Sequence, residues 1–194
     1  MPPDTDPRRR DLMQIAVNGW GTAEILKQRA DSYAKKLRVS SLIGFALPVV
    51  VGATVIALGA DWQYLKQALV LVAVVSAIQA LYNAYLIFRG YEREMQECLY
   101  SAAVNRDLAT RAEQLAKQVQ LESDQFDSLV QQIQGENANQ ERHDERKHFT
   151  AKERRIAGRH GLFHFQQKCG VCKCVPPSLD AKADKSKCKF CGDF

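Results

Sequence analysis

Charged residues are absent from two long stretches of this 194-residue sequence, residues 39–60 and residues 67–88. Each stretch has 22 residues, so as a helix each would rise about 33 Å, enough to cross a hydrocarbon layer of about 30 Å. The alternative is a pair of buried core helices in a soluble bundle. The rest of the chain is too polar to surround two helices that are apolar on every side, so the sequence predicts two transmembrane helices.

Catalytic motifs are missing as well. The sequence has no glycine-rich nucleotide loop, no pair of carboxylates suited to acid and base catalysis, and no nucleophile beside a base. We therefore expect that the protein is not an enzyme.

Only six residues, 61–66, join the two apolar stretches, which predicts an antiparallel hairpin. Trp62 and Tyr64 in this loop suit the interface between membrane and water. Seven basic residues flank the other end of the hairpin: Lys27, Arg29, Lys35, Lys36, Arg38, Arg89 and Arg93. The loop has only Lys66, so we expect both termini in the cytoplasm. The first stretch is no signal peptide, because it begins about forty residues into the chain and a second stretch follows it.

Five of the six cysteines lie in the last 26 residues. Four of them form two Cys-x2-Cys pairs, Cys169 with Cys172 and Cys188 with Cys191, and fifteen residues separate the pairs. This pattern is typical of a four-thiolate zinc site with no open position for catalysis. Disulfide bonds or unpaired thiols are the alternatives, but cytoplasmic thiols stay reduced. We predict a structural Zn²⁺ ion bound by these four cysteines.

The segment between the two pairs has few apolar side chains. Burial alone could not fold such a tail, so metal binding would supply the folding energy. Cys174 could replace Cys172 as a ligand, and the spacing leaves both open. Cys98 lies in a predicted helix, where we expect a packed free thiol.

Downstream of the hairpin, one stripe of residues recurs at steps of four and three: Leu108, Ala112, Leu115, Val119, Glu122, Phe126, Leu129 and Ile133. This heptad pattern predicts one long helix over residues 89–134. The stripe suits a homo-oligomeric coiled coil, or alternatively packing against the N-terminal helix, where a matching stripe comprises Leu26, Ala30, Tyr33 and Leu37. Gly135 and the charged run after it predict a solvated linker or frayed helix over residues 135–150.

The tail is basic. Residues 146–194 carry 12 basic and 4 acidic residues, a net charge of +8, whereas residues 89–145 carry 6 and 12, a net charge of −6. A basic tail could contact nucleic acid or anionic lipid. Aromatic residues that would stack on bases are few there (Phe163, Phe165 and Phe190), so nucleic acid is the less favoured partner.

Three polar residues lie inside the second apolar stretch. Ser76, Gln79 and Asn83 are spaced by three and four residues, so they share one helix face. Polar groups inside a membrane need partners. This face could pack against the first helix of the hairpin, or several hairpins could assemble around it to form a neutral polar pore. Selectivity by a charged ring is excluded, because neither stretch has a charge.

Two resemblances follow from these features. With a basic amphipathic helix, a two-span hairpin and a long helix, residues 10–134 resemble the SLATT class of bacterial two-transmembrane effector domains. The C-terminal motifs CGVC, PPSL and CKFCGDF resemble those of the mobilome CxxCx(11)CxxC proteins, small membrane proteins of mobile elements, although fifteen residues separate the pairs here. The resemblance implies an effector of a prokaryotic conflict system, such as anti-phage defence, in the bacterial inner membrane.

We therefore expect an all-α membrane protein with five parts: a basic segment with an amphipathic helix (1–38), the transmembrane hairpin (39–88), the long helix or coiled coil (89–134), a charged linker (135–160) and a zinc ribbon or knuckle (161–194). The expected partners are the lipid bilayer, further copies of the chain and an unidentified protein or signal. The expected function is a self-assembling effector that permeabilises the membrane under control of the zinc module. The alternative is a passive membrane-anchored zinc-ribbon adaptor that recruits a protein or nucleic acid.

Overall fold

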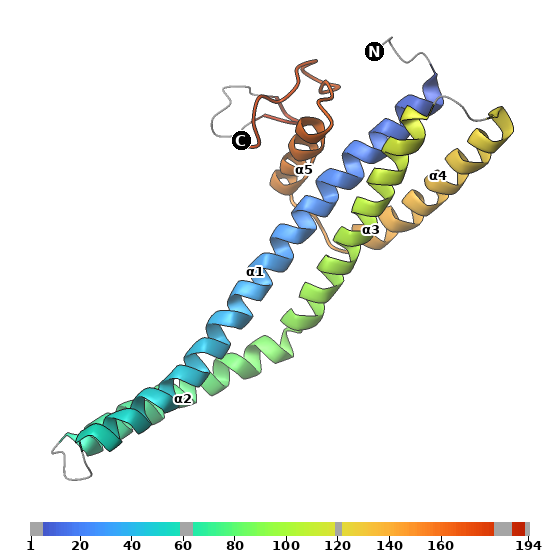
Figure 1. The fold of residues 1–194 in the computed structure, drawn as a ribbon. Coiled ribbons are helices and arrows are strands. Elements are labelled where there is room, and N and C mark those ends of the chain that lie inside the picture. Colours follow the sequence, from blue (N-terminus) through green and yellow to red (C-terminus); the bar gives the residue numbers. More distant parts are fainter. Residues whose placement is uncertain (1–5, 59–63, 119–121, 181–187, 193–194) are drawn as a thin grey trace. The chain divides into compact units, whose positions relative to one another are not determined.

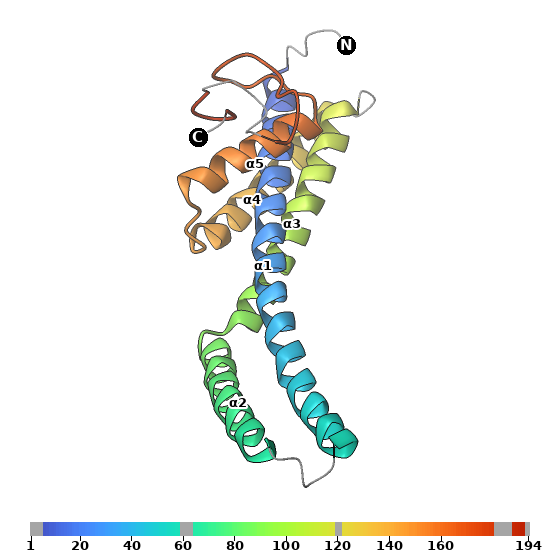
Figure 2. The same cartoon turned by 90° about the vertical axis from the view of Figure 1, so that its left-hand side faces the viewer.

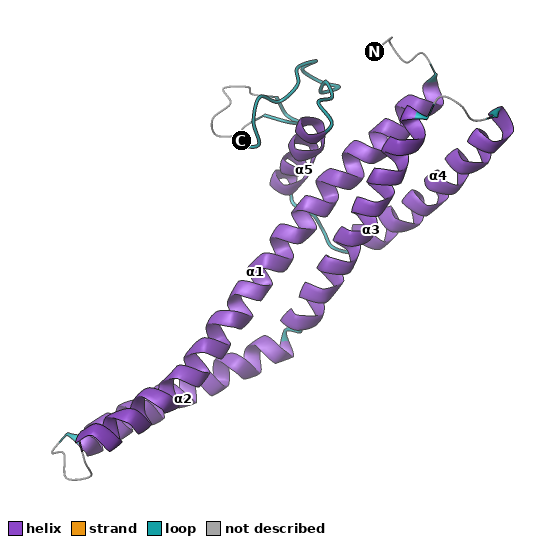
Figure 3. Ribbon diagram, viewed as in Figure 1, coloured by secondary structure: helices purple, strands orange, loops and turns teal. Residues whose placement is uncertain are grey.

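The structure, a computed structural model, describes residues 6–58, 64–118, 122–180 and 188–192. In chain order its helices are α1 (Pro7–Leu58), α2 (Leu65–Phe88), α3 (Tyr91–Lys117), α4 (Ser123–Glu145) and α5 (Ala151–His164) (Figure 1). The described residues form no strand, which confirms the predicted all-helical class (Figure 3). The chain divides into two compact units: a bundle unit, Met1–Gln28 with Cys98–Phe194, and a hairpin unit, Arg29–Glu97.

Helix α1 has 52 residues and includes both the predicted amphipathic segment and the first apolar stretch. At a rise of about 1.5 Å per residue, it is about 78 Å long. The boundary that we predicted at residue 38 is not a helix end, because residues 36–42 contain no glycine or proline that would break the helix. One helix therefore contributes residues to both units.

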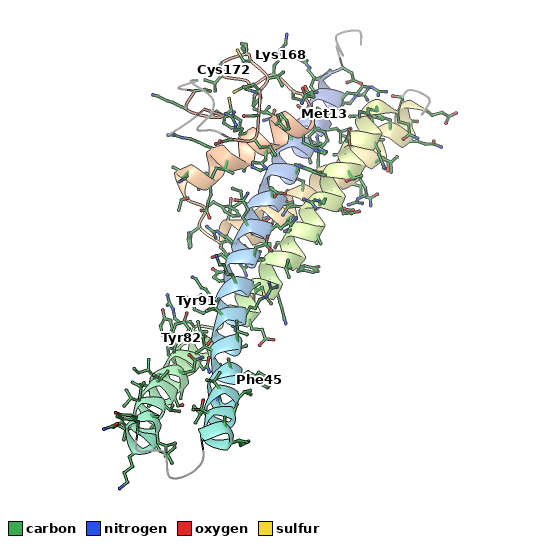
Figure 4. The ribbon with its side chains drawn as sticks, turned by 60° about the vertical axis from the view of Figure 1, so that its left-hand side comes forward. Met13, Phe45, Tyr82, Tyr91, Lys168 and Cys172 are labelled. Atoms are coloured by element: carbon green, nitrogen blue, oxygen red, sulfur yellow. The ribbon has the colours of Figure 1, made fainter. Side chains whose placement is uncertain are left out.

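The hairpin unit presents apolar side chains on its surface. The apolar parts of α1 and α2 are long and apolar enough to cross a membrane, and only 6% of each apolar window is buried. Phe45 in α1 is 75% exposed and Phe88 in α2 is 90% exposed. Figure 4 shows Phe45 pointing away from α2. These helices are therefore not the buried core of a soluble bundle formed by this chain.

Gly90 separates α2 from α3. Its φ of +64° is left-handed, a conformation that glycine adopts without steric cost. The amide of Gly90 donates to the carbonyl oxygen of Ile87, and that of Arg89 donates to Tyr85, both over 2.9 Å. These bonds satisfy the last carbonyls of α2, so the helix ends here and α3 begins at Tyr91.

The single helix that we predicted for residues 89–134 is wrong. Helix α3 ends at Lys117 and α4 begins at Ser123, and the two lie beside α1 in the bundle unit (Figure 2). Most of the predicted stripe is buried inside the chain. One core contains Leu12, Ala16, Ala112, Leu115, Ala116, Phe126, Val130 and Ile133. The stripe residues among them pack on Leu12 and Ala16 of the N-terminal helix. The contact is intrachain, but this core does not include the predicted partner stripe of Leu26, Ala30, Tyr33 and Leu37; Val119 lies outside the described residues.

Gly135 does not end a helix, because α4 continues through it to Glu145. A glycine in a helix interior costs about 1 kcal/mol relative to alanine. Buried side chains on both sides of it, including Ile133 and Gln140, hold α4 in place. The residues that we predicted as a charged linker are therefore largely helical.

Helix α5 begins at a capping box. Thr150 Oγ1 accepts a hydrogen bond from the amide of Glu153 over 3.2 Å, and the amide of Thr150 donates to Glu153 Oε2 over 2.8 Å. The two bonds satisfy backbone amides that the first turn of the helix leaves without partners. Helix α5 leads directly into the cysteine-rich tail.

Candidate metal centre

Four cysteine sulfurs come together at the end of the bundle unit. The Sγ atoms of Cys169, Cys172, Cys188 and Cys191 all lie within 4.8 Å of one another. Cys169 Sγ is 3.8 Å from Cys188 Sγ, and Cys172 Sγ is 3.6 Å from Cys191 Sγ. Four sulfurs at about 2.3 Å from a tetrahedral ion lie about 3.8 Å apart, whereas a disulfide bond needs about 2.05 Å. The four cysteines that the sequence spacing singled out could thus hold a metal ion.

Each Cys-x2-Cys pair is closed by its own backbone hydrogen bond. The carbonyl oxygen of Cys169 accepts from the amide of Lys173 over 2.9 Å, and that of Cys188 accepts from the amide of Gly192 over 2.9 Å. We call residues 169–173 the first knuckle and residues 188–192 the second knuckle. Lys173 closes the first knuckle with a left-handed φ of +62°. The position of the two sulfurs within each knuckle is therefore set by local backbone geometry.

The surroundings of the thiols set their protonation. Burial disfavours the thiolate of Cys188, but hydrogen bonds from the backbone amides of Cys191 and Phe190 outweigh this and lower the pKa of Cys188 to about 6. Burial raises the pKa of Cys169 and of Cys191, and neighbouring thiols raise that of Cys191 further. Four thiols this close cannot all ionise without a nearby cation. A bound dication would supply that charge.

Arg159 in α5 connects the helix to the tail. Its side chain is buried, with 1% of the residue exposed. The guanidinium donates to three backbone carbonyl oxygens: Cys191 over 2.8 Å, Ser178 over 2.8 Å and Asp180 over 3.4 Å. Four thiolates and one dication carry a net charge of −2, so a buried cation beside them is favourable. Sequence reasoning missed Arg159, because nothing in the sequence distinguishes it from exposed basic residues such as Arg154.

Two glycines bring the backbones of α1 and α5 into contact within the bundle unit (Figure 2). A Cβ atom on Gly161 would lie 2.0 Å from the carbonyl oxygen of Val17, and one on Gly21 would lie 2.1 Å from that of Ala157. Neither position accepts a side chain unless the helices separate. A small core adjoins this crossing and comprises Val17, Leu162, Cys169 and Cys191. The candidate metal centre is therefore packed against α1.

The second knuckle also packs on α5. A Cβ atom on Gly158 would lie 2.8 Å from Cε1 of Phe190, which sits between Cys188 and Cys191 in the sequence. Gly158 is buried. An alanine there would therefore displace the Phe190 ring.

The remaining two cysteines lie outside the cluster. Cys174 is exposed, and its thiol donates to the carbonyl oxygen of Cys172 over 3.4 Å. Cys98 is buried in α3, as expected for a packed thiol. Figure 4 labels Cys172 and Lys168 in the tail.

In the hairpin unit, two of the three predicted polar residues meet Ser40 of α1. Gln79 Nε2 donates to the carbonyl oxygen of Ser40 over 2.7 Å, and Ser40 Oγ donates to Asn83 Oδ1. Ser40 is 3% exposed, and sequence reasoning missed it. Ser76 is exposed. These contacts are those of the packing alternative, and a pore lined by this face stays a prediction.

Comparison with known proteins identifies a family. A family model described as Mobilome CxxCx(11)CxxC protein matches residues 9–194, which include both cysteine pairs. No curated protein and no solved structure matches the chain.

Proposed function

The chain belongs to the Mobilome CxxCx(11)CxxC protein family, and from that premise we propose that it is a membrane effector of a prokaryotic mobile-element or conflict system. In this proposal the hairpin unit inserts into the cytoplasmic membrane with both termini in the cytoplasm. Several chains assemble there and permeabilise or perturb the membrane. A cytoplasmic zinc module controls the assembly, and the role is not enzymatic.

The exposed apolar surface of the hairpin unit carries this proposal. Large side chains such as Phe45, Ile87 and Phe88 are exposed on helices that are long enough to cross a bilayer. Burying one such side chain is worth about 1.5–3 kcal/mol. No part of the chain that the structure describes buries these side chains, so lipid or further hairpins would supply the burial.

The four-cysteine cluster supports zinc as the metal. Four thiolates at tetrahedral spacing form the usual closed structural zinc site, whereas oxygen ligands would favour calcium or magnesium. Cys169, Cys172, Cys188 and Cys191 would hold the ion, which would join the two knuckles without taking part in catalysis. Arg159 would fix the carbonyl oxygen of Cys191 and offset part of the negative charge of the bound site.

A specific observation favours a second candidate function, the passive zinc-ribbon anchor. Gln79 and Asn83 make their hydrogen bonds to Ser40 within one hairpin. These side chains therefore need no water-filled path between chains. In this second candidate, the hairpin holds the zinc module at the membrane, where it recruits a partner protein or nucleic acid.

Dye release from vesicles separates the two candidates. The full-length, metal-loaded chain is reconstituted into vesicles that contain a fluorescent dye, and co-flotation with the vesicles is measured in parallel. The effector should release dye. If assembly is required, dye release should rise more than linearly with the number of chains per vesicle. If the chain floats with the vesicles but releases no dye, even after addition of an extract from host cells in which the system is activated, it is a passive anchor.

A matched control tests whether insertion causes the release. Val70 and Val74 are exposed on α2, so the double variant Val70→Asp, Val74→Asp should leave the bundle unit and its metal content unchanged. A charge in the middle of an apolar helix costs a few kcal/mol in lipid, so this variant should neither float nor release dye. Release by this variant would show that insertion is not the cause.

A further inference from the structure

An aromatic and basic cluster lies at one end of the hairpin unit. The rings of Tyr33 and Tyr91 meet edge to face, with centroids 5.3 Å apart, and the ring of Tyr85 lies 6.4 Å from that of Tyr91. Lys36 Nζ lies 5.0 Å from the centroid of Tyr91 and 5.8 Å from that of Tyr33. The guanidinium of Arg89 interacts with the phenols of Tyr85 and Tyr91. Figure 4 shows Tyr91 near Tyr82, on the side of the hairpin unit where α3 begins.

The cations of this cluster differ from those of the bundle unit in their partners. In the bundle unit Arg8, Arg106 and Arg111 each form an ion pair with a carboxylate: Asp127, Glu24 and Glu136, respectively. In the part of the hairpin unit that the structure describes, no carboxylate lies within ion-pair distance of Lys36 or Arg89. Both side chains are exposed. Two solvent-exposed cations that both interact with Tyr91 leave a place for an external anion.

The position of the cluster along the helices indicates which anion. Lys36 lies three residues before the first apolar stretch, and Arg89 directly follows Phe88, the last residue of α2. Inserted in a bilayer, these cations would lie where hydrocarbon gives way to headgroups, the depth that tyrosine also prefers. The anion at that depth is the phosphate of a phospholipid.

We propose that Lys36, Arg89, Tyr85 and Tyr91, the interfacial cluster, bind the phosphate of an anionic phospholipid headgroup. Lys36 and Arg89 supply the charge, and the two phenols supply hydroxyl donors beside it. The proposal rests on the membrane insertion proposed above. A zwitterionic headgroup brings its own cation next to Lys36 and Arg89, so the cluster selects lipids with a net negative charge. Each basic side chain near an anionic membrane surface contributes about fivefold in binding, so the pair should contribute about 25-fold.

The test measures lipid retained by the full-length chain. The chain is reconstituted in vesicles of phosphatidylcholine alone or with added phosphatidylglycerol, and extracted protein is examined by native mass spectrometry. Wild-type chain should retain phosphatidylglycerol in preference to phosphatidylcholine. The double variant Lys36→Gln, Arg89→Gln should lose this preference by about 25-fold, whereas Lys36→Arg, Arg89→Lys should keep it.

A control double variant removes the same number of positive charges outside the interfacial cluster. Lys27 and Lys152 are exposed basic residues of the bundle unit, away from the ends of the apolar stretches, so Lys27→Gln, Lys152→Gln should retain phosphatidylglycerol as the wild type does. Equal loss in both double variants would overturn the site in favour of general surface charge. Equal retention by wild type and the Lys36→Gln, Arg89→Gln variant would overturn it outright, and displacement of the lipid by inorganic phosphate would make it a site for soluble anions.

Flotation and dye release separate this proposal from the proposed function. A chain that floats and retains phosphatidylglycerol but releases no dye supports the lipid site and contradicts the effector. A chain that floats and releases dye without lipid preference contradicts the lipid site alone. A chain that floats with neither kind of vesicle contradicts membrane insertion and the lipid site together.

Discussion

Arg159 Nη1 donates a hydrogen bond to the carbonyl oxygen of Cys191 over 2.8 Å, and both residues are buried. The bond joins α5 to the second knuckle at one of the candidate metal ligands. The same guanidinium also donates to the carbonyl oxygens of Ser178 and Asp180. Loss of the side chain would therefore leave three carbonyl groups without this donor. The side chain that positions this ligand therefore comes from a helix outside the two knuckles.

We predict that Arg159→Ala lowers the free energy of unfolding by about 2–3 kcal/mol, because buried acceptors lose their donor. Zinc should also pass to a chelator faster. Arg159→Lys keeps the charge but not the planar fork of donors, so its effect should be intermediate. Arg154→Ala, at an exposed position of the same helix, is the control and should change stability by less than about 0.5 kcal/mol. Thermal unfolding and zinc release measure both effects; equal behaviour of Arg159→Ala and Arg154→Ala would contradict the role of Arg159.

The metal itself is tested by elemental analysis. The purified full-length chain should contain about one zinc ion per chain. The double variant Cys188→Ser, Cys191→Ser should lose the zinc and the fold of the tail, since the metal supplies much of the folding free energy. Cys174→Ser should keep the zinc, because Cys174 lies outside the cluster. Stoichiometric zinc in the double variant would disprove the ligand set, and zinc loss in Cys174→Ser would make Cys174 a ligand.

Two glycine-to-alanine changes should have opposite signs. Gly161→Ala places a methyl group against the carbonyl oxygen of Val17, so it should destabilise the bundle unit by about 2 kcal/mol or more. Gly135→Ala lies in α4 with nothing within 4 Å, so it should stabilise the chain by about 0.5–1 kcal/mol. Thermal unfolding of both variants beside wild type gives the comparison. A neutral Gly161→Ala would mean that α1 and α5 are not in close contact.

Orientation in the membrane is measured with a membrane-impermeant thiol reagent on intact cells. Single cysteines replace Asp11, Lys66 or Lys152 in a chain that already carries Cys98→Ser and Cys174→Ser. The cysteine at position 66 should react above the background of the parent chain, and those at 11 and 152 should not, because basic residues flank the terminal side of both spans. Reaction at 11 and 152 but not at 66 would mean that the hairpin is inverted.

The polar contact inside the hairpin unit has its own test. Replacing Gln79 and Asn83 by leucine removes hydrogen bonds to Ser40 that are worth about 0.6 kcal/mol each in a membrane. We expect insertion, zinc content and dye release to persist, because these side chains serve packing within one hairpin. Loss of dye release with unchanged insertion and oligomer size would show that this face lines a pore.

The apolar helices and the sulfur cluster could be predicted from the sequence, because each depends on residue types within a short segment. The absence of charge in residues 39–60 and 67–88 gave the apolar helices, and the spacing of Cys169, Cys172, Cys188 and Cys191 gave the sulfur cluster. A zinc ligand set depends on residue type and short spacing, both visible in one sequence.

Other features carry no such signal. The stripe from Leu108 to Ile133 does not reveal the break between α3 and α4, because two helices that each bury one face have the same spacing of three and four as one long helix. The partners of Arg159 are backbone carbonyl groups, which every residue has. The fit of Gly161 against Val17 depends on two segments that lie far apart in the sequence.

Because each knuckle is closed by its own hydrogen bond, to Lys173 or to Gly192, the backbone geometry within each pair does not depend on the number of residues between the pairs. The family description gives eleven residues there, and this chain has fifteen. Lengthening a connection between two fixed ends from eleven to fifteen residues costs about 0.3 kcal/mol of closure entropy, a small amount beside the stability of a domain. Four extra residues between the knuckles would therefore cost a metal site held by these cysteines little affinity.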